Sequence, residues 1–190
     1  MPARDYMETL ITAGTDGTAL TAAARNSALP AAAIVTLPPN FFDFIGKQVL
    51  LKASGKVSVV ITTPGTLRFD VNFLDSAAAN AIVSDTGAIL GNIVAKTDTP
   101  FYLELLLTCR AIGTSANIMT GGYLFTAATI LTAAIATGPG PGGSLYPWNA
   151  APVVGANFNS TLAQQVDLRF TQTVATGSLT LQQYSLIRMN

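Results

Sequence analysis

The chain is poor in charge and in the residue types on which most enzymes rely. It contains no histidine, one cysteine, and only ten basic and ten acidic residues among 190. Histidine is a common general base and metal ligand, so its absence removes the usual partner of a serine or cysteine nucleophile. The acidic residues form no cluster with metal-site spacing, and the sequence has no glycine-rich phosphate loop. We therefore expect no enzymatic activity, no metal and no other cofactor.

The composition also argues against several partners and locations. The formal net charge is zero, whereas proteins that bind nucleic acid or anionic lipid need a basic excess. The first residues contain no apolar stretch typical of a signal peptide. The longest weakly polar run, 124–136, is shorter than the roughly 20 residues of a membrane span. Cys109 has no partner for an intrachain disulfide. We expect a protein made in the cytoplasm that binds neither nucleic acid nor membrane.

The chain does contain the periodicity of β-strands. Apolar and polar residues alternate in four segments, at 57–61, 67–73, 103–109 and 166–170, apart from Val60 and Leu106. A period of two turns one face of a strand toward a core and the other toward water. Turn-forming pairs such as Asp16-Gly17, Ser54-Gly55 and Gly121-Gly122 punctuate the sequence. These patterns predict an all-β fold, an antiparallel β-sandwich of jelly-roll-like form.

Some local features need separate predictions. Residues 40–45 are expected to form one helical turn, and residues 75–83 a short helix or an irregular crossover. The alanine triplets at 22–24 and 31–33 lie near prolines, which favours extended or loop structure. The charges on the wetter strand faces are predicted to form solvated or cross-strand pairs of small energetic value. These pairs are Arg68/Asp70, Glu104/Arg110 and Asp167/Arg169.

The domain organisation follows from composition. Residues 1–30 are rich in threonine and alanine and are expected to form an extended N-terminal arm, followed by a single sandwich domain at 31–190. Residues 137–160 are rich in glycine and proline, which predicts a long docking loop. The aromatic residues Tyr146, Trp148 and Phe158 are the candidate interaction residues in this loop. We expect the arm and the loop to contact other subunits, and the sandwich to fold without residues 1–30.

One short motif raises an enzymatic alternative. Residues 84–88, Ser-Asp-Thr-Gly-Ala, resemble the Asp-Thr-Gly-Ala turn of aspartic proteases, in which two chains each supply one aspartate. Those enzymes carry a second apolar-apolar-glycine element well downstream, and residues 111–113 come too soon to supply it. We interpret Asp85 as part of an ordinary turn.

A longer resemblance covers residues 34–113. The order runs from Thr-Leu-Pro-Pro-Asn-Phe-Phe at 36–42 to Gly46-Lys47, then to Lys-Ala-Ser-Gly-Lys-Val at 52–57. It continues with Thr-Leu-Arg-Phe-Asp-Val at 66–71, Phe-Tyr-Leu-Glu-Leu at 101–105 and Thr-Cys-Arg-Ala-Ile-Gly at 108–113. This order resembles the β-sandwich, jelly-roll-like structural proteins of tailed bacteriophage virions, including head decoration or cement proteins. The resemblance implies a virion location, trimers or other symmetric clusters, and no catalysis.

These inferences favour a viral structural protein. The first hypothesis is a homotrimeric capsid decoration or cement subunit that binds the major capsid protein or other virion proteins and stabilises the head. A second hypothesis is a tail, baseplate or fibre-base component. A third, of a different class, is a carbohydrate- or receptor-binding virion module that would use Tyr146 and Trp148. The low charge supports an assembly role, because the cores of protein interfaces are depleted in charged residues.

Overall fold

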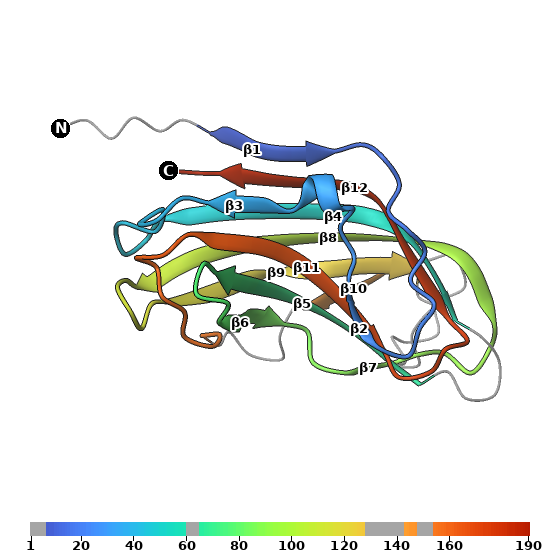
Figure 1. Cartoon of the computed structure of the whole chain (residues 1–190). Coiled ribbons are helices and arrows are strands. Elements are labelled where there is room, and N and C mark those ends of the chain that lie inside the picture. Colours follow the sequence, from blue (N-terminus) through green and yellow to red (C-terminus); the bar gives the residue numbers. More distant parts are fainter. Residues whose placement is uncertain (1–6, 60–64, 128–142, 148–153) are drawn as a thin grey trace.

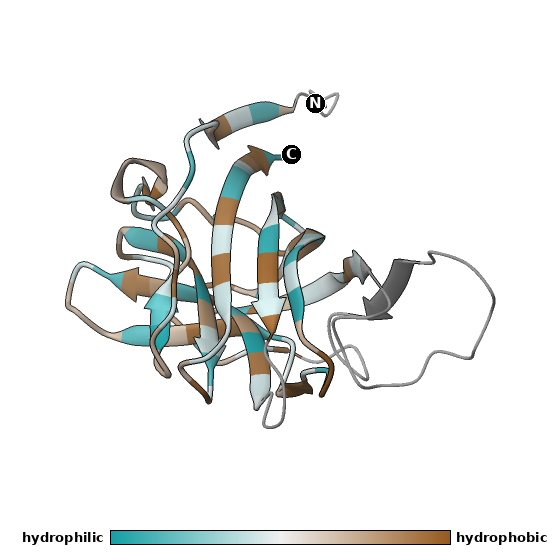
Figure 2. Ribbon diagram, turned by 90° about the vertical axis from the view of Figure 1, so that its right-hand side faces the viewer, coloured by the Kyte–Doolittle hydropathy of each residue, from teal (hydrophilic) through white to brown (hydrophobic). Residues whose placement is uncertain are grey.

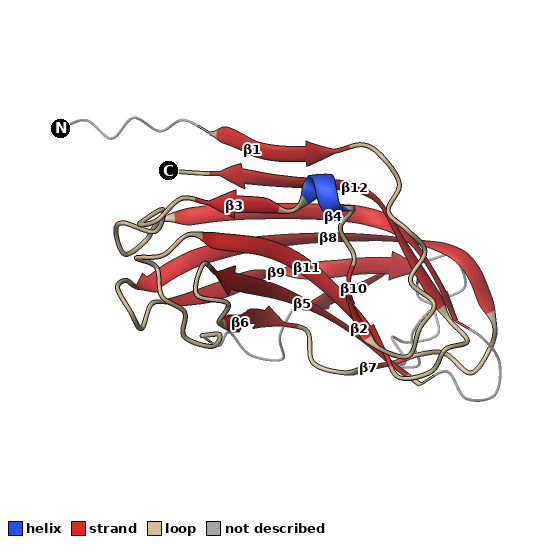
Figure 3. Ribbon diagram, in the orientation of Figure 1, coloured by secondary structure: helices blue, strands red, loops and turns tan. Residues whose placement is uncertain are grey.

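The computed structural model describes residues 7–59, 65–127, 143–147 and 154–190. The structure is almost entirely β and consists of two packed sheets, which confirms the predicted antiparallel β-sandwich (Figures 1 and 3). Sheet A has the order β1 (Glu8–Ala13), β12 (Ser178–Arg188), β4 (Gln48–Val59), β8 (Lys96–Ala111), β9 (Asn117–Ala127) and β10 (Gly143–Pro147). Sheet B has the order β2 (Arg25–Ser27), β11 (Gln164–Gln172), β5 (Thr66–Asp75) and β6 (Asn80–Asp85).

Two short strands extend sheet B. Strand β3 (Val35–Leu37) pairs with β11, and β7 (Ile89–Leu90) pairs with β5. All of the described strand pairs are antiparallel. The chain changes sheet between β1 and β2, β3 and β4, β4 and β5, β7 and β8, and on either side of β11. Such repeated crossing between two layers is typical of jelly-roll folds.

The core lies between the sheets and follows the alternation in the sequence. In β4 every second residue from Val49 to Val59 is buried, and in β8 every second residue from Phe101 to Cys109 is buried. Alternating apolar and polar bands along the strands show the same pattern in Figure 2. Two groups of rings fill the core, one made of Phe42, Phe73 and Phe158, the other of Phe69, Phe101 and Phe170.

Three local predictions are wrong. Residues 75–83 form the end of β5, the turn and the first part of β6, because the Asp75 carboxylate accepts the backbone N–H groups of Ala77 and Ala79, both at 2.9 Å. Residues 40–45 form bends and turns rather than a helical turn. Residues Ala31–Ala33 form a single 3₁₀ turn, the helical segment in Figure 3, where we predicted extended or loop structure.

Two glycine-containing pairs that were predicted as turns, Ser54-Gly55 and Gly121-Gly122, lie inside strands instead. Gly55 is within β4 and Gly122 is within β9. A Cβ atom on Gly55 would lie 2.1 Å from the Thr180 carbonyl oxygen, and one on Gly122 would lie 2.2 Å from the Glu104 carbonyl oxygen. These glycines are therefore explained by close approach of neighbouring backbones rather than by chain reversal.

The segment predicted as an arm contributes strands to both sheets. Strand β1 pairs with β12, which places Glu8 opposite Arg188, and β2 pairs with β11. Ala28 and Leu29, which follow β2, are buried in the core. Removing residues 1–30 would therefore strip one edge from each sheet and uncover part of the core. The prediction that the sandwich folds without this segment conflicts with these contacts.

Candidate functional site

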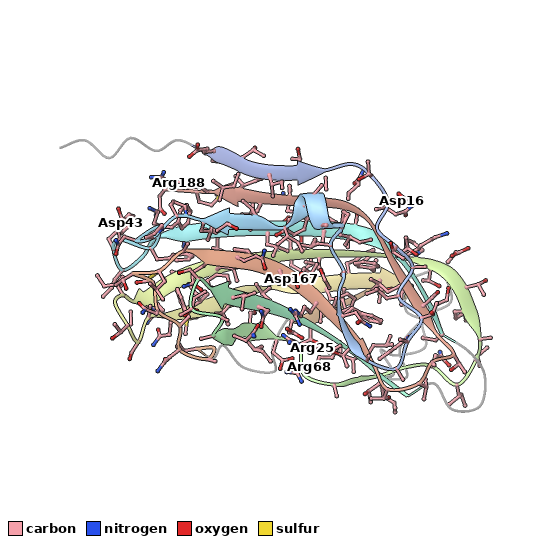
Figure 4. The ribbon with its side chains drawn as sticks, viewed as in Figure 1. Asp16, Arg25, Asp43, Arg68, Asp167 and Arg188 are labelled. Atoms are coloured by element: carbon pink, nitrogen blue, oxygen red, sulfur yellow. The ribbon has the colours of Figure 1, made fainter. Side chains whose placement is uncertain are left out.

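The outer faces of the two sheets carry different chemistry. The outer face of sheet B bears a network of arginine and aspartate side chains, which we call the arginine face (Arg25, Arg68, Arg169, Asp70, Asp85 and Asp167; Figure 4 labels three of them). The outer face of sheet A bears aromatic rings among neutral polar groups.

The centre of the arginine face is a buried carboxylate. Asp70 has no exposed side-chain surface, although it projects from the outer side of β5. Arg25 of β2 reaches across β11 and donates from Nε to Asp70 Oδ2 at 3.0 Å and from Nη2 to Asp70 Oδ1. The same Nη2 donates to Asn72 Oδ1 at 3.1 Å. The pair raises the pKa of Arg25, chiefly through the hydrogen bond to Asp70. Arg25 therefore links the edge strand β2 to β5 across the outer face of β11.

A second buried carboxylate lies beside it. Asp167 of β11 accepts hydrogen bonds from Ser27 Oγ at 2.7 Å and from Arg169 Nε at 2.9 Å. Burial raises the pKa of Asp167 despite both of these bonds. The pairs were predicted to be solvated or cross-strand. Solvation is wrong for Asp70 and Asp167, which are both buried, but Asp70 does form a cross-strand pair, with Arg25. The Asp167/Arg169 pair itself is present.

Asp85, the residue of the protease-like motif, belongs to the same network. Its carboxylate is paired with the Arg68 guanidinium, and its Oδ1 also accepts the Gly87 N–H at 2.7 Å. Aspartic proteases need two carboxylates that share a proton, whereas the partner of the Asp85 carboxylate is an arginine. Arg68 therefore pairs with Asp85 and not with Asp70 as predicted, and this arrangement fits a structural ion pair.

The outer face of sheet A combines rings with neutral polar groups. Tyr102 of β8 lies opposite Phe125 of β9 in the register, and Tyr123 lies one pleat away, opposite Glu104. The Tyr102 and Tyr123 ring centroids are 6.3 Å apart, and Phe125 is 45% exposed. We call these three rings the aromatic face. Next to Tyr123, a Cβ atom on Gly121 would meet nothing within 4 Å, so this part of the face is open.

A polar hydrogen-bond system borders the aromatic face. The Tyr102 hydroxyl donates to Glu104 Oε2 at 2.7 Å, and Lys52 Nζ lies 3.2 Å from the same oxygen. The Tyr102 hydrogen bond is the main cause that lowers the pKa of Glu104, and Lys52 adds to it. Glu104 therefore pairs with Lys52, whereas the sequence had suggested Arg110. The pair is electrically neutral and fixes the orientation of the Tyr102 ring.

A hollow of about 400 Å³ adjoins Tyr102. Its polar lining includes side chains from β1, β12 and β4, namely Thr12, Lys52, Ser54, Gln183 and Ser185. Ser54 Oγ donates to Gln183 Oε1 at 3.2 Å. Small-ligand sites typically occupy about 300–1,000 Å³ and combine aromatic walls with a few fixed polar groups. The outer face of sheet A therefore has the composition of a ligand surface.

The three predicted interaction residues do not come together on a surface that the structure describes. Phe158 is 5% exposed and packs against Phe42 and Phe73, so its ring belongs to the core. The backbone of Tyr146, in β10, pairs with that of Leu124 in β9, and Trp148 lies outside the described residues. The sequence analysis missed the aromatic face. The signal was present, because Tyr102 flanks the buried Leu103 and Tyr123 and Phe125 flank the buried Leu124, so alternation places these rings on the outer face.

Exposed apolar side chains occur at both ends of the sandwich. Phe44, Ile45 and Ile112 lie in two turns joined by the hydrogen bond from Gly46 N to the Cys109 carbonyl oxygen, at 2.8 Å. We call these three residues the apolar tip. At the opposite end, Leu90, Ile93 and Val94 are exposed around β7. Clustered exposed apolar side chains, unlike singly exposed ones, mark surfaces that meet other proteins.

Within residues 7–59, 65–127, 143–147 and 154–190, no group of three or more histidine, cysteine, aspartate or glutamate residues is placed to hold a metal ion. Across the same residues, no helix has the length and apolarity needed to cross a membrane.

The fold defines the chain as an antiparallel β-sandwich protein, and comparisons with known proteins add little beyond this class. No family model matches the chain, and no curated protein matches it. Among solved structures, the chain is similar to the CBM2 module of an evolved Dit protein from Lactobacillus casei BL23 phage J-1. The match has a TM-score of 0.30 and 11% sequence identity, and it covers 83% of this chain and 68% of that module. Similarity at this level does not transfer the function of that module.

Proposed function

We propose that this protein is a non-enzymatic structural subunit of a bacteriophage virion, which decorates the head by binding the major capsid protein. The observation that carries the proposal is the exposure of apolar side chains at both ends of the sandwich. Ile45 at the apolar tip is 64% exposed, and Ile93 at the opposite end is 62% exposed. A subunit that bridges two neighbours needs a contact surface at each of two separated places.

The rest of the molecule supports a mechanical role. The arginine face joins β2 to β5 and β5 to β6 through ion pairs, and Ser27 joins β2 to β11 through its hydrogen bond to Asp167, so the face strengthens the subunit. The sequence resemblance at residues 34–113 points in the same direction. A homotrimer with its copies repeated on a shell would gain avidity from many weak contacts. We place the protein in the virion, assembled in the host cytoplasm.

Two other functions stay as alternatives. A tail, baseplate or fibre-base component would use the same sandwich and the same exposed ends with different neighbours. A receptor- or carbohydrate-binding virion module is favoured by a separate observation, the aromatic face of sheet A. These functions are separable because the apolar tip and the aromatic face lie on different surfaces.

The proposal is tested by the oligomeric state and by shell binding. Light scattering should give a stable trimer, and the protein should sediment with genome-free capsids of its phage and raise their melting temperature. Phe44→Asp should abolish co-sedimentation because it puts a charge into an apolar contact. Phe125→Asp is the matched control, because Phe125 and Phe44 are similarly exposed, at 45% and 42%. A monomer that ignores capsids would overturn the decoration role.

A further inference from the structure

The aromatic face and the adjacent hollow form one continuous surface. The strand register gives two rows across sheet A. One row runs Thr12, Ser185, Lys52, Glu104 and Tyr123. The neighbouring row runs Gln183, Ser54, Tyr102 and Phe125. Both rows have polar groups on the β1–β12–β4 side; on the β8–β9 side the first row has Glu104 and one ring, and the second row has two rings.

We propose that this surface binds a neutral carbohydrate. Sugar rings present C–H groups on their faces and hydroxyl groups on their edges. The negative π face of an aromatic ring attracts such C–H groups, and hydroxyls need neutral donors and acceptors in fixed positions. Tyr102, Tyr123 and Phe125 supply the rings, while Gln183 and Ser54 supply the amide and hydroxyl groups.

The charge distribution selects a neutral ligand over other classes. Lys52 is the cation of the hollow, and its Nζ is 3.2 Å from Glu104 Oε2, so the two charges cancel. An anionic polysaccharide or a nucleic acid would need an excess of cations along the hollow and the aromatic face. Glu104 and Lys52 are 30% and 38% exposed, so both remain within reach of sugar hydroxyls.

The polar groups are held in place before any ligand arrives. Tyr102 is fixed by its hydrogen bond to Glu104, and the Gln183 carbonyl oxygen accepts from Ser54 at 3.2 Å. This second bond turns the NH₂ group of the Gln183 amide into the donor available to a ligand. A preorganised surface on a rigid sheet lowers the entropy cost of binding.

The experiment is native affinity electrophoresis of the full chain in gels that contain a soluble polysaccharide. Neutral probes are dextran, galactomannan and a mixed-linkage β-glucan, and alginate is the anionic probe. We expect at least one neutral probe to retard the protein, and we expect Phe125→Ala to weaken that binding about tenfold or more. Phe44→Ala, an equally exposed ring at the apolar tip, should bind like the unmodified protein. Gln183→Ala should also bind more weakly, and urea unfolding should confirm that every variant is folded.

Several outcomes would overturn the inference. One such outcome is that none of the three neutral polysaccharides retards the protein. Another is that alginate alone retards it. If Phe125→Ala and Phe44→Ala lost polysaccharide binding to the same extent, the aromatic face would not be the binding site. Capsid co-sedimentation of the same variants keeps the two proposals apart. The decoration role predicts that Phe44→Ala weakens shell binding and Phe125→Ala does not, whatever the gels show.

Discussion

Replacement of Arg25 by methionine tests whether the arginine face holds the N-terminal segment onto the sandwich. Methionine keeps an apolar stem over β11 and removes the guanidinium. Asp70, which has no exposed side-chain surface, then loses the two hydrogen bonds that Arg25 donates to its carboxylate. Asn72 Oδ1 loses a donor as well. The variant therefore leaves a charge inside the protein without its partner.

The expected loss can be estimated from the burial of the two groups. Removing one member of a buried ion pair costs about 3–5 kcal/mol, because the remaining charge is stranded away from water. The Arg25 side chain is 28% exposed, so water screens part of the interaction, and we expect about 2–3 kcal/mol. For a chain of this size that corresponds to a fall in melting temperature of about 5–10 °C.

Urea unfolding at neutral pH measures the effect, and Arg188→Met is the matched control. Arg188 is 27% exposed, but its partner Glu8 is 50% exposed and 3.6 Å away. The control should lose less than about 1 kcal/mol, since exposed pairs contribute little. Adding Asp70→Asn to Arg25→Met should recover most of the loss, because no charge is then stranded.

The reasoning would be refuted if Arg25→Met and Arg188→Met unfolded at the same urea concentration. It would also fail if Asp70→Asn further destabilised the Arg25→Met protein. Either result would mean that water reaches Asp70 easily and that β2 is held by its backbone pairing with β11 alone.

Three other predictions concern a close backbone approach and two carboxyl groups. Gly122→Ala should cost about 2–3 kcal/mol in urea unfolding because its Cβ would clash with the neighbouring strand, whereas Gly121→Ala should be nearly neutral. Burial raises the pKa of Asp167 in the folded state above its ordinary value of 3.8. As the pH falls from the raised pKa toward 3.8, the folded state binds a proton that the unfolded state does not, so the native protein should gain stability relative to Asp167→Asn. Tyr102→Phe should raise the pKa of Glu104 toward its ordinary value of 4.5, as followed by NMR titration of the carboxyl carbon.

Each of these predictions has a clear opposing result. Equal stability of the Gly122→Ala and Gly121→Ala proteins would show that β8 and β9 can separate without cost. A stability difference between the native protein and Asp167→Asn that does not change with pH would mean that Asp167 is hydrated in the fold. An unchanged Glu104 titration after Tyr102→Phe would assign the lowered pKa to Lys52 alone.

The sandwich class was predictable because its main signal is local. Side chains alternate across a strand with a period of two, so the positions of Val71 and Phe73 in the sequence already assign them to one face. The same alternation assigns Tyr123 and Phe125 to the face opposite Leu124. This reasoning needs no knowledge of which strands are neighbours.

The partners of the charged residues were not predictable, because strand order decides them. Arg68 and Asp70 share one face of β5, which suggested a pair, but Arg68 meets Asp85 across the hairpin. Asp70 instead meets Arg25, which is 45 residues earlier in the chain and two strands away. Propensity also misassigned Gly55, since the reason for that glycine is the carbonyl oxygen of Thr180 on the neighbouring strand.

The sequence by itself therefore determined the class of fold, the core faces of the strands and the low charge of the surface, because composition and alternation are properties of consecutive residues. Tertiary structure alone decided which side chains share a surface. Tyr102 and Phe125 become neighbours only through the register of β8 and β9, and Gln183 joins them only because β12 lies beside β4. Pairing between strands far apart in sequence is set by the packing of the whole sandwich, so the candidate site exists only once the sheets have formed.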